Sequence, residues 1–91
     1  EVEPGLYDEQ ALRVRAGVRH ARAVVREGLA WAQDEAAQLV PRLFGTGRVE
    51  RIVDLCAAPG TKTRQLAEGL APGGVLLAVD RHAGRLGRLL R

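Results

Sequence analysis

The sequence predicts an α/β fold, because two short apolar runs flank a helical stretch within about 30 residues, the size of a βαβ unit. The runs cover residues 52–55 and 75–79, and the helical stretch covers residues 62–70. Parallel strands in such a unit are buried on both faces and therefore read as continuous apolar runs. We expect this unit to be preceded by helices.

Length and composition indicate one small soluble domain. The 91 residues are 46% hydrophobic and 27% charged, which is close to globular averages. No segment approaches the roughly 20 apolar residues that span a bilayer, and the acidic start does not resemble a signal peptide, so we expect a cytoplasmic protein without membrane contact. The single cysteine, Cys56, excludes a disulfide framework and a cysteine-only zinc site, and no structural metal is expected.

The net charge of +3 comes almost entirely from arginine. Arginine suits phosphate groups, so nucleic acid is a plausible partner. A solvated basic surface explains the charge equally well, because only clustered basic residues are informative.

The first half of the chain predicts helices. Residues 1–10 show no apolar period and are interpreted as a frayed end or a connection. Residues 12–15 are either a short strand or the start of a longer helix; because Gly17 disfavours a helix interior, we expect the strand, followed by a helix over about 20–27. Across residues 12–29 a basic stripe at helical spacing is formed by Arg15, Arg19, Arg22 and Arg26.

A second helix is predicted from about residue 33, where acidic residues precede apolar residues at spacings of three and four. Pro41 should kink this helix or end it early, because a proline ring clashes with the preceding turn. The run Gly45-Thr46-Gly47 then predicts a boundary near 45–48. The expected domains are a helical segment over residues 1–45 and the βαβ unit over residues 46–91.

In the βαβ unit, Pro72-Gly73-Gly74 is interpreted as the break before the second strand. A further helix is expected over residues 81–91, where leucine and arginine fall on different sides.

A ligand site is predicted where the two parallel strands end. Ligands of open parallel sheets bind beyond the carboxyl ends of the strands, and both the turn at residues 56–61 and Asp80 fall there. Asp80 follows Gly60 at the spacing from which an acidic residue reaches a ribose. The turn lacks the three glycines of a dinucleotide site, which favours a nucleoside ligand without phosphates, such as S-adenosylmethionine. Alternatively, this is an ordinary turn, with Asp80 capping the next helix.

The letters of the turn make the prediction more specific. The sequence DLCAAPGTKT, residues 54–63, resembles the first cofactor motif of the RNA 5-methylcytosine methyltransferases of the Sun and NOL1/NOP2 family. The segment WAQDEAAQLV, residues 31–40, is similar to the helix that precedes the cofactor domain of this family. Thr61 departs from the family, which has a second glycine there; if that position needs a positive φ, Thr61 weakens cofactor binding.

The resemblance implies a Rossmann-like class I methyltransferase fold, of which this chain would be the first part. It also implies S-adenosylmethionine as cofactor and an rRNA or tRNA substrate. Asp54 would lie near the amino-acid end of the cofactor, and Gln33 and Asp34 would pack the preceding helix. The implied cofactor-binding residues are Cys56, Ala57, Ala58, Pro59, Gly60, Thr61, Lys62 and Asp80.

No catalytic residue is assigned within the chain. The nucleophilic cysteine of the family lies in later motifs, so Cys56 is interpreted as a small buried side chain at a strand end, and Lys62 either contacts the cofactor or is solvated. We therefore expect a fragment of an RNA cytosine-5 methyltransferase that is inactive alone. The alternative is a non-catalytic module that binds an adenine-containing ligand or RNA; a purely structural helical adaptor is disfavoured, because two motifs occur in family order.

Overall fold

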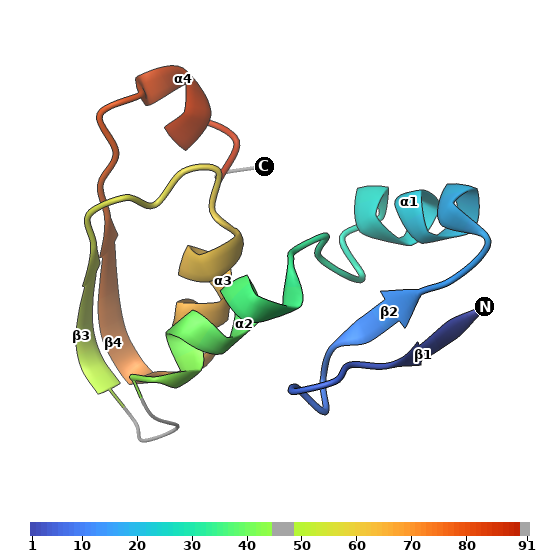
Figure 1. Cartoon of the computed structure of the whole chain (residues 1–91). Helices are drawn as coiled ribbons and strands as arrows, with labels where there is room; N and C mark the ends of the chain where they lie inside the picture. Colours follow the sequence, from blue (N-terminus) through green and yellow to red (C-terminus); the bar gives the residue numbers. More distant parts are fainter. Residues whose placement is uncertain (45–48, 90–91) are drawn as a thin grey trace. The chain divides into compact units, whose positions relative to one another are not determined.

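The computed structural model describes residues 1–44 and 49–89, which divide into two units, Glu1–Leu39 and Val40–Arg91 (Figure 1). Helix α2 (Glu35–Arg42) runs across the division. The predicted boundary near 45–48 lies outside the described residues, and the assignment of domains remains a prediction.

The first unit begins with a small antiparallel sheet. Strand β1 (Val2–Pro4) pairs with β2 (Leu12–Val14), with Val2 opposite Val14. Next to the pair, the Arg15 amide donates to the Glu1 carbonyl oxygen at 3.1 Å. The interpretation of residues 1–10 as a frayed end is therefore wrong, whereas the predicted short strand near residues 12–15 is confirmed.

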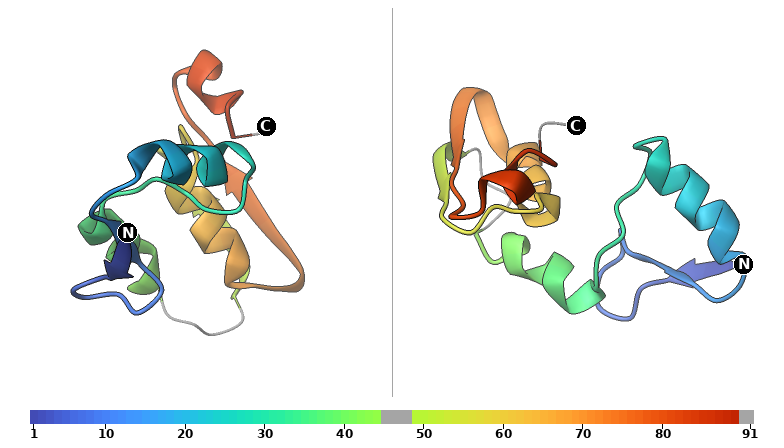
Figure 2. Two further views of the ribbon diagram at one scale, coloured as in Figure 1. Left: turned by 90° about the vertical axis from the view of Figure 1, so that its right-hand side faces the viewer. Right: turned by 90° about the horizontal axis from the view of Figure 1, so that it is seen from above.

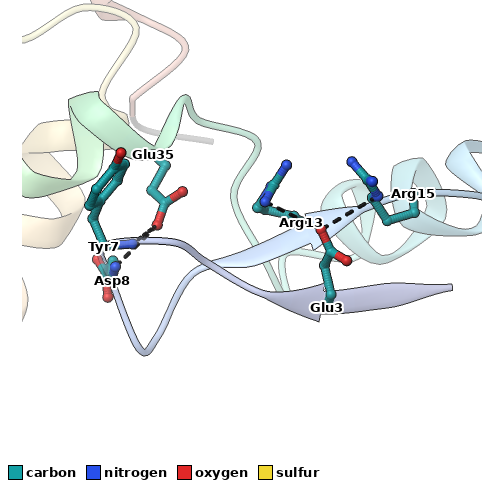
Figure 3. Close-up of polar contacts among 6 residues, drawn as sticks. All are labelled: Glu3, Tyr7, Asp8, Arg13, Arg15 and Glu35. Carbon is teal, nitrogen blue, oxygen red and sulfur yellow. Dashed lines mark hydrogen bonds and ion pairs between the residues drawn. The ribbon is translucent and has the colours of Figure 1, made fainter.

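The loop between β1 and β2 is fastened by the first residue of α2. The backbone amides of Tyr7 and Asp8 donate to Glu35 Oε1 at 2.6 and 3.1 Å (Figure 3). In the sheet, Glu3 of β1 forms ion pairs with Arg13 of β2 and with Arg15, the residue that follows β2. A side chain at Gly5 would lie 2.5 Å from Glu35 Oε1. Glycine at this position therefore lets the loop approach the carboxylate.

Helix α1 (Val18–Arg26) lies between two glycines in left-handed conformations. Gly17, with φ of 82°, precedes it, and Gly28, with φ of 75°, follows it. The helix begins two residues before the predicted start, because Gly17 forms the N-cap instead of interrupting the helix. The predicted short helix is confirmed over the longer alternative.

Pro41 lies in the last turn of α2 and is buried. The helix ends one residue later, at Arg42, although the apolar pattern continues to Phe44. The predicted early end is confirmed, since proline lacks the amide that would bond to the preceding turn.

The second unit contains the predicted βαβ arrangement. Strands β3 (Val49–Asp54) and β4 (Leu70–Ala78) pair in parallel, and helix α3 (Thr61–Glu68) connects them. Asp54 is the register partner of Ala78, so the carboxyl ends of both strands are level. Figures 1 and 2 show α3 along one face of this pair. The mixed α/β class is confirmed.

The predicted break at Pro72-Gly73-Gly74 is wrong, because β4 continues through it. Val49 pairs with Leu70 and Arg51 pairs with Val75. Glu50 alone therefore lies opposite residues 71–74, which form an irregular bulge. Gly73 accommodates the bend with φ of 78°. Proline and glycine in a strand are compatible with such a bulge.

The face of the pair opposite to α3 carries exposed apolar side chains. Val53 and Leu77 are 59% and 55% exposed, whereas Ile52 and Leu76 on the other face are partly buried. Parallel sheets are usually covered on both faces, so this surface is unusual for a finished parallel sheet.

Helix α4 (Ala83–Leu86) follows β4 and is shorter than the predicted helix over residues 81–91. Turns continue to Leu89, and the last predicted residues, 90–91, lie outside the described part of the chain.

Candidate functional site

Residues 56–60 form a turn that is held against the end of β4. The Ala58 amide donates to Asp80 Oδ2 at 3.0 Å, and the Ala57 amide donates to the Val79 carbonyl oxygen at 3.0 Å. The Val79 amide in return donates to the Asp54 carbonyl oxygen at 2.8 Å. The structure thus brings together the turn and Asp80, the two parts of the predicted site.

The carboxylate of Asp80 accepts a second backbone hydrogen bond, from the His82 amide to Oδ1 at 2.8 Å. The amides of His82 and Ala58 hold the pKa of Asp80 below its ordinary value of 3.8, and the nearby charges of His82 and Arg85 act in the same direction. The carboxylate is therefore ionised at neutral pH. Each oxygen accepts one amide and keeps a lone pair for a further donor.

The bond to His82 also bears on the capping alternative, because His82 is the N-cap residue of α4. Asp80 accepts the amide of this residue and no amide of the first turn, and among the described residues no side chain caps α4. The interpretation of Asp80 as the cap of that helix is therefore wrong.

A buried threonine, Thr63, contacts both the turn and the end of β3. Thr63 is 2% exposed, and its hydroxyl lies 2.6 Å from Asp54 Oδ2 and 3.1 Å from the Ala57 carbonyl oxygen. A hydroxyl has one proton, and the shorter contact to the carboxylate is the stronger hydrogen bond. Asp54 Oδ1 accepts the Cys56 amide at 3.1 Å. Both oxygens of Asp54 therefore shape the turn.

No role is predicted for Thr63 from the sequence. The sequence pattern is a hydroxyl side chain in the first turn of a helix, some residues after an aspartate at a strand end. This pattern predicts a contact only when the turn is known to bring the two residues together.

Gly60 takes the left-handed conformation that the turn requires. Its φ is 114°, and it is the N-cap residue of α3. Thr61 is the first residue of that helix, and no described residue other than glycine has a positive φ. The departure of Thr61 from the family pattern therefore causes no backbone strain.

The predicted site residues differ in exposure. Ala57 and Gly60 are buried, and Ala58, Thr61 and Asp80 are partly buried. Cys56, Pro59 and Lys62 are exposed. The interpretation of Cys56 as buried is wrong, because β3 ends at Asp54 and the chain has left the sheet at this position. For Lys62, exposure at the start of α3 is compatible with both predicted roles.

The polar groups at this end of the sheet form a suitable set for a nucleoside linked to an amino acid. The first amides of α3 have no acceptor within the helix, and they favour a carboxylate. The ionised Asp80 can accept from a pair of hydroxyl groups. S-adenosylmethionine carries both kinds of group, so the residues present fit this cofactor.

Within residues 1–44 and 49–89, no helix is both long and apolar enough to cross a membrane. The same residues include no group of three or more histidine, cysteine, aspartate or glutamate side chains that could hold a metal ion.

Replacing Thr63 by valine is expected to lower the free energy of unfolding by about 1–3 kcal/mol, because Asp54 Oδ2 loses its donor. Serine at the same position keeps the hydroxyl and loses one methyl group, which costs about 1 kcal/mol. Urea unfolding followed by circular dichroism measures both variants. Valine as stable as the native threonine would show that the hydrogen bond contributes nothing.

A model of one protein family matches residues 43–91, and it describes the 16S rRNA methyltransferases RsmB/F. The match includes the turn, Asp80 and the whole βαβ unit. No solved structure gives a significant match.

Curated relatives carry the same kind of name. The chain is 43% identical over 63 residues to a probable ribosomal RNA small subunit methyltransferase B of Synechocystis, covering 69% of this chain and 14% of that protein. It is 33% identical over 82 residues to the corresponding Bacillus subtilis protein, covering 90% and 18%. A Salmonella arizonae relative is 41% identical over 86 residues, covering 94% and 20%. The chain thus spans less than a quarter of the length of these relatives.

Proposed function

The chain belongs to the family of RsmB/F 16S rRNA methyltransferases, and from this premise we propose that it supplies the S-adenosylmethionine-binding region of an RNA cytosine-5 methyltransferase. The βαβ unit would then be the first part of a Rossmann-like sheet. The observation that carries the proposal is the contact between the Ala58 amide and Asp80 Oδ2 at 3.0 Å, because it joins the glycine-containing turn to the acidic residue that follows the next strand, β4.

Each part of this region has a role in the proposal. Asp80 accepts hydrogen bonds from the ribose hydroxyls, and the first amides of α3 hold the carboxylate of the methionine end. Residues 56–60 line the cofactor, with Gly60 providing the bend. Asp54 and Thr63 fix the shape of the turn through their hydrogen bond of 2.6 Å. When bound, S-adenosylmethionine supplies an electrophilic methyl group on its sulfonium.

Cys56 is not the nucleophile of the proposed reaction. It is the only cysteine of the 91 residues, and it lies two residues after β3, in the turn assigned to the cofactor. The reaction requires a cysteine thiolate that adds to carbon 6 of cytosine. The resemblance places the cysteine that supplies this thiolate in another motif. The 91 residues by themselves are therefore expected to bind the cofactor without methylating RNA.

The substrate proposed for the whole enzyme is ribosomal or transfer RNA. The support comes from the relatives, which are named as ribosomal RNA small subunit methyltransferases, and from the arginine-rich composition of the chain.

Isothermal titration tests the proposed cofactor. S-adenosylmethionine and its demethylated product are titrated into the 91-residue chain, with ATP as a ligand that shares adenosine but adds phosphates. We expect binding of both cofactor forms and at least tenfold weaker binding of ATP, because the turn lacks the glycines that admit a pyrophosphate. Equal or tighter binding of ATP would favour the alternative of a general adenine-binding module. A folded chain that binds none of the three contradicts the proposal.

A further inference from the structure

The exposed basic face of α1 is a surface that the cofactor site does not explain. Arg19, Arg22 and Arg26 are spaced by three and four residues, so they lie on one side of the helix. All three are exposed, and α1 has no buried residue. From Arg19 to Arg26 the helix rises by about 10 Å, which gives a narrow row of three positive charges.

The composition of the first unit shows that this row is not a general excess of basic residues. Residues 1–39 contain seven acidic and five basic side chains, which gives 5 − 7 = −2. Helix α1 nevertheless contains three arginines and no acidic residue. Positive charge is therefore concentrated on one helix of an otherwise acidic unit.

The two other arginines of this unit behave differently. Arg13 and Arg15 both pair with Glu3, at 3.3 and 3.4 Å (Figure 3). Among the described residues, no ion pair involves the three arginines of α1. Their guanidinium groups are available to an external anion.

We propose that Arg19, Arg22 and Arg26 of α1 bind the phosphate backbone of the RNA substrate. The inference rests on the proposed function, which supplies RNA as the partner. Exposed guanidinium groups in a row fit repeated phosphates. The helix contains no phenylalanine, tyrosine or tryptophan on which bases could stack, so we expect the contact to be sequence-blind and to position the RNA without selecting the cytosine.

An anionic membrane is the other polyanion that a basic helix could meet. The apolar residues of α1 are only valine and alanine, whereas helices that lie in a membrane interface carry tryptophan, phenylalanine or leucine. The side chains of α1 therefore favour RNA.

The test measures how RNA binding depends on salt. A fluorescein-labelled single-stranded RNA of about 20 nucleotides is titrated with the 91-residue chain between about 50 and 200 mM KCl, and anisotropy reports binding. Each phosphate contact to a single strand contributes about 0.7 to the slope of log K against log salt. Changing all three arginines to glutamine should reduce the slope by about 2, so that the native chain loses about 16-fold more affinity than the variant over this range.

The matched control changes the same three arginines to lysine, which keeps the charges and should keep the slope. Circular dichroism checks folding, and S-adenosylmethionine titration is carried out on every variant. An unchanged slope in the glutamine variant overturns the inference. The inference is also overturned if the arginine substitutions weaken binding to phosphatidylglycerol vesicles but leave RNA binding unchanged. Failure of the native chain to bind cofactor would count against the proposed function alone, because the RNA measurement does not depend on it.

Discussion

Replacing Asp80 by asparagine is expected to weaken S-adenosylmethionine binding about 100-fold or more. Hydrogen bonds to a charged group contribute about 1.5–3 kcal/mol each, and two are lost or weakened at the ribose. Since about 1.4 kcal/mol corresponds to a factor of ten, the combined loss reaches this size. Isothermal titration measures the change. Glu68→Gln, which alters the same charge at an exposed residue at the end of α3, should bind like the native chain.

A structural role of Asp80 must be separated from contact with the ligand, because its oxygens also accept the amides of Ala58 and His82. Cofactor analogues that lack the 2′ or the 3′ hydroxyl provide the separation. The native chain should bind these analogues about tenfold more weakly than the cofactor, since one charged hydrogen bond is lost. The Asp80→Asn variant should show a much smaller difference in affinity between the cofactor and these analogues. A variant that keeps the full discrimination shows that Asp80 only supports the turn.

The lowered pKa of Asp80 sets the pH range of this effect. A carboxylate whose pKa is lower in the folded chain stays ionised as pH falls past its ordinary value of 3.8, and it becomes protonated only below that. Binding that depends on its charge should therefore be constant from about pH 8 to about pH 5, far above the titration of an aspartate. A loss of affinity centred near pH 6 would indicate a different group, such as a histidine.

The βαβ unit could be predicted from the sequence because its signals are local. Continuous apolar runs mark β3 and β4, and the turn between β3 and α3 has a distinctive order of letters. Only the structure shows that the positive φ of this turn falls at Gly60 and not at Thr61. The meeting of the turn with Asp80 followed from parallel pairing alone.

Other features could not be predicted because they depend on residues far apart in the sequence. The loop before β2 is held by Glu35, which is 28 residues from Tyr7. The bulge in β4 depends on which residue of β3 lies opposite Pro72. Thr63 gains its role only when the turn brings Asp54 and Ala57 to its hydroxyl. In each case local sequence propensity does not predict the feature, because a tertiary contact determines it.

Replacing Gly60 by alanine is expected to lower the free energy of unfolding of the second unit by about 2–5 kcal/mol. A non-glycine residue in a left-handed conformation costs about 1–2 kcal/mol, and Gly60 has φ of 114°. The new Cβ would also lie 2.8 Å from Leu89 Cγ and 3.1 Å from Leu89 Cβ. Moving packed side chains to relieve such contacts costs about 1–3 kcal/mol.

Two further variants divide this cost between backbone and packing. Gly73 also has a positive φ, of 78°, but a Cβ there would meet no atom within 4 Å, so Gly73→Ala should show the backbone cost alone. Combining Gly60→Ala with Leu89→Ala should remove the two shortest contacts and so most of the packing cost, so that the double variant is more stable than the sum of the single changes predicts. Thermal unfolding measures all of them, at about 4–8 °C per kcal/mol for a domain of this size. If Gly60→Ala and Gly73→Ala lose equal stability, Leu89 does not pack tightly against the turn, and the glycine is needed for its φ alone.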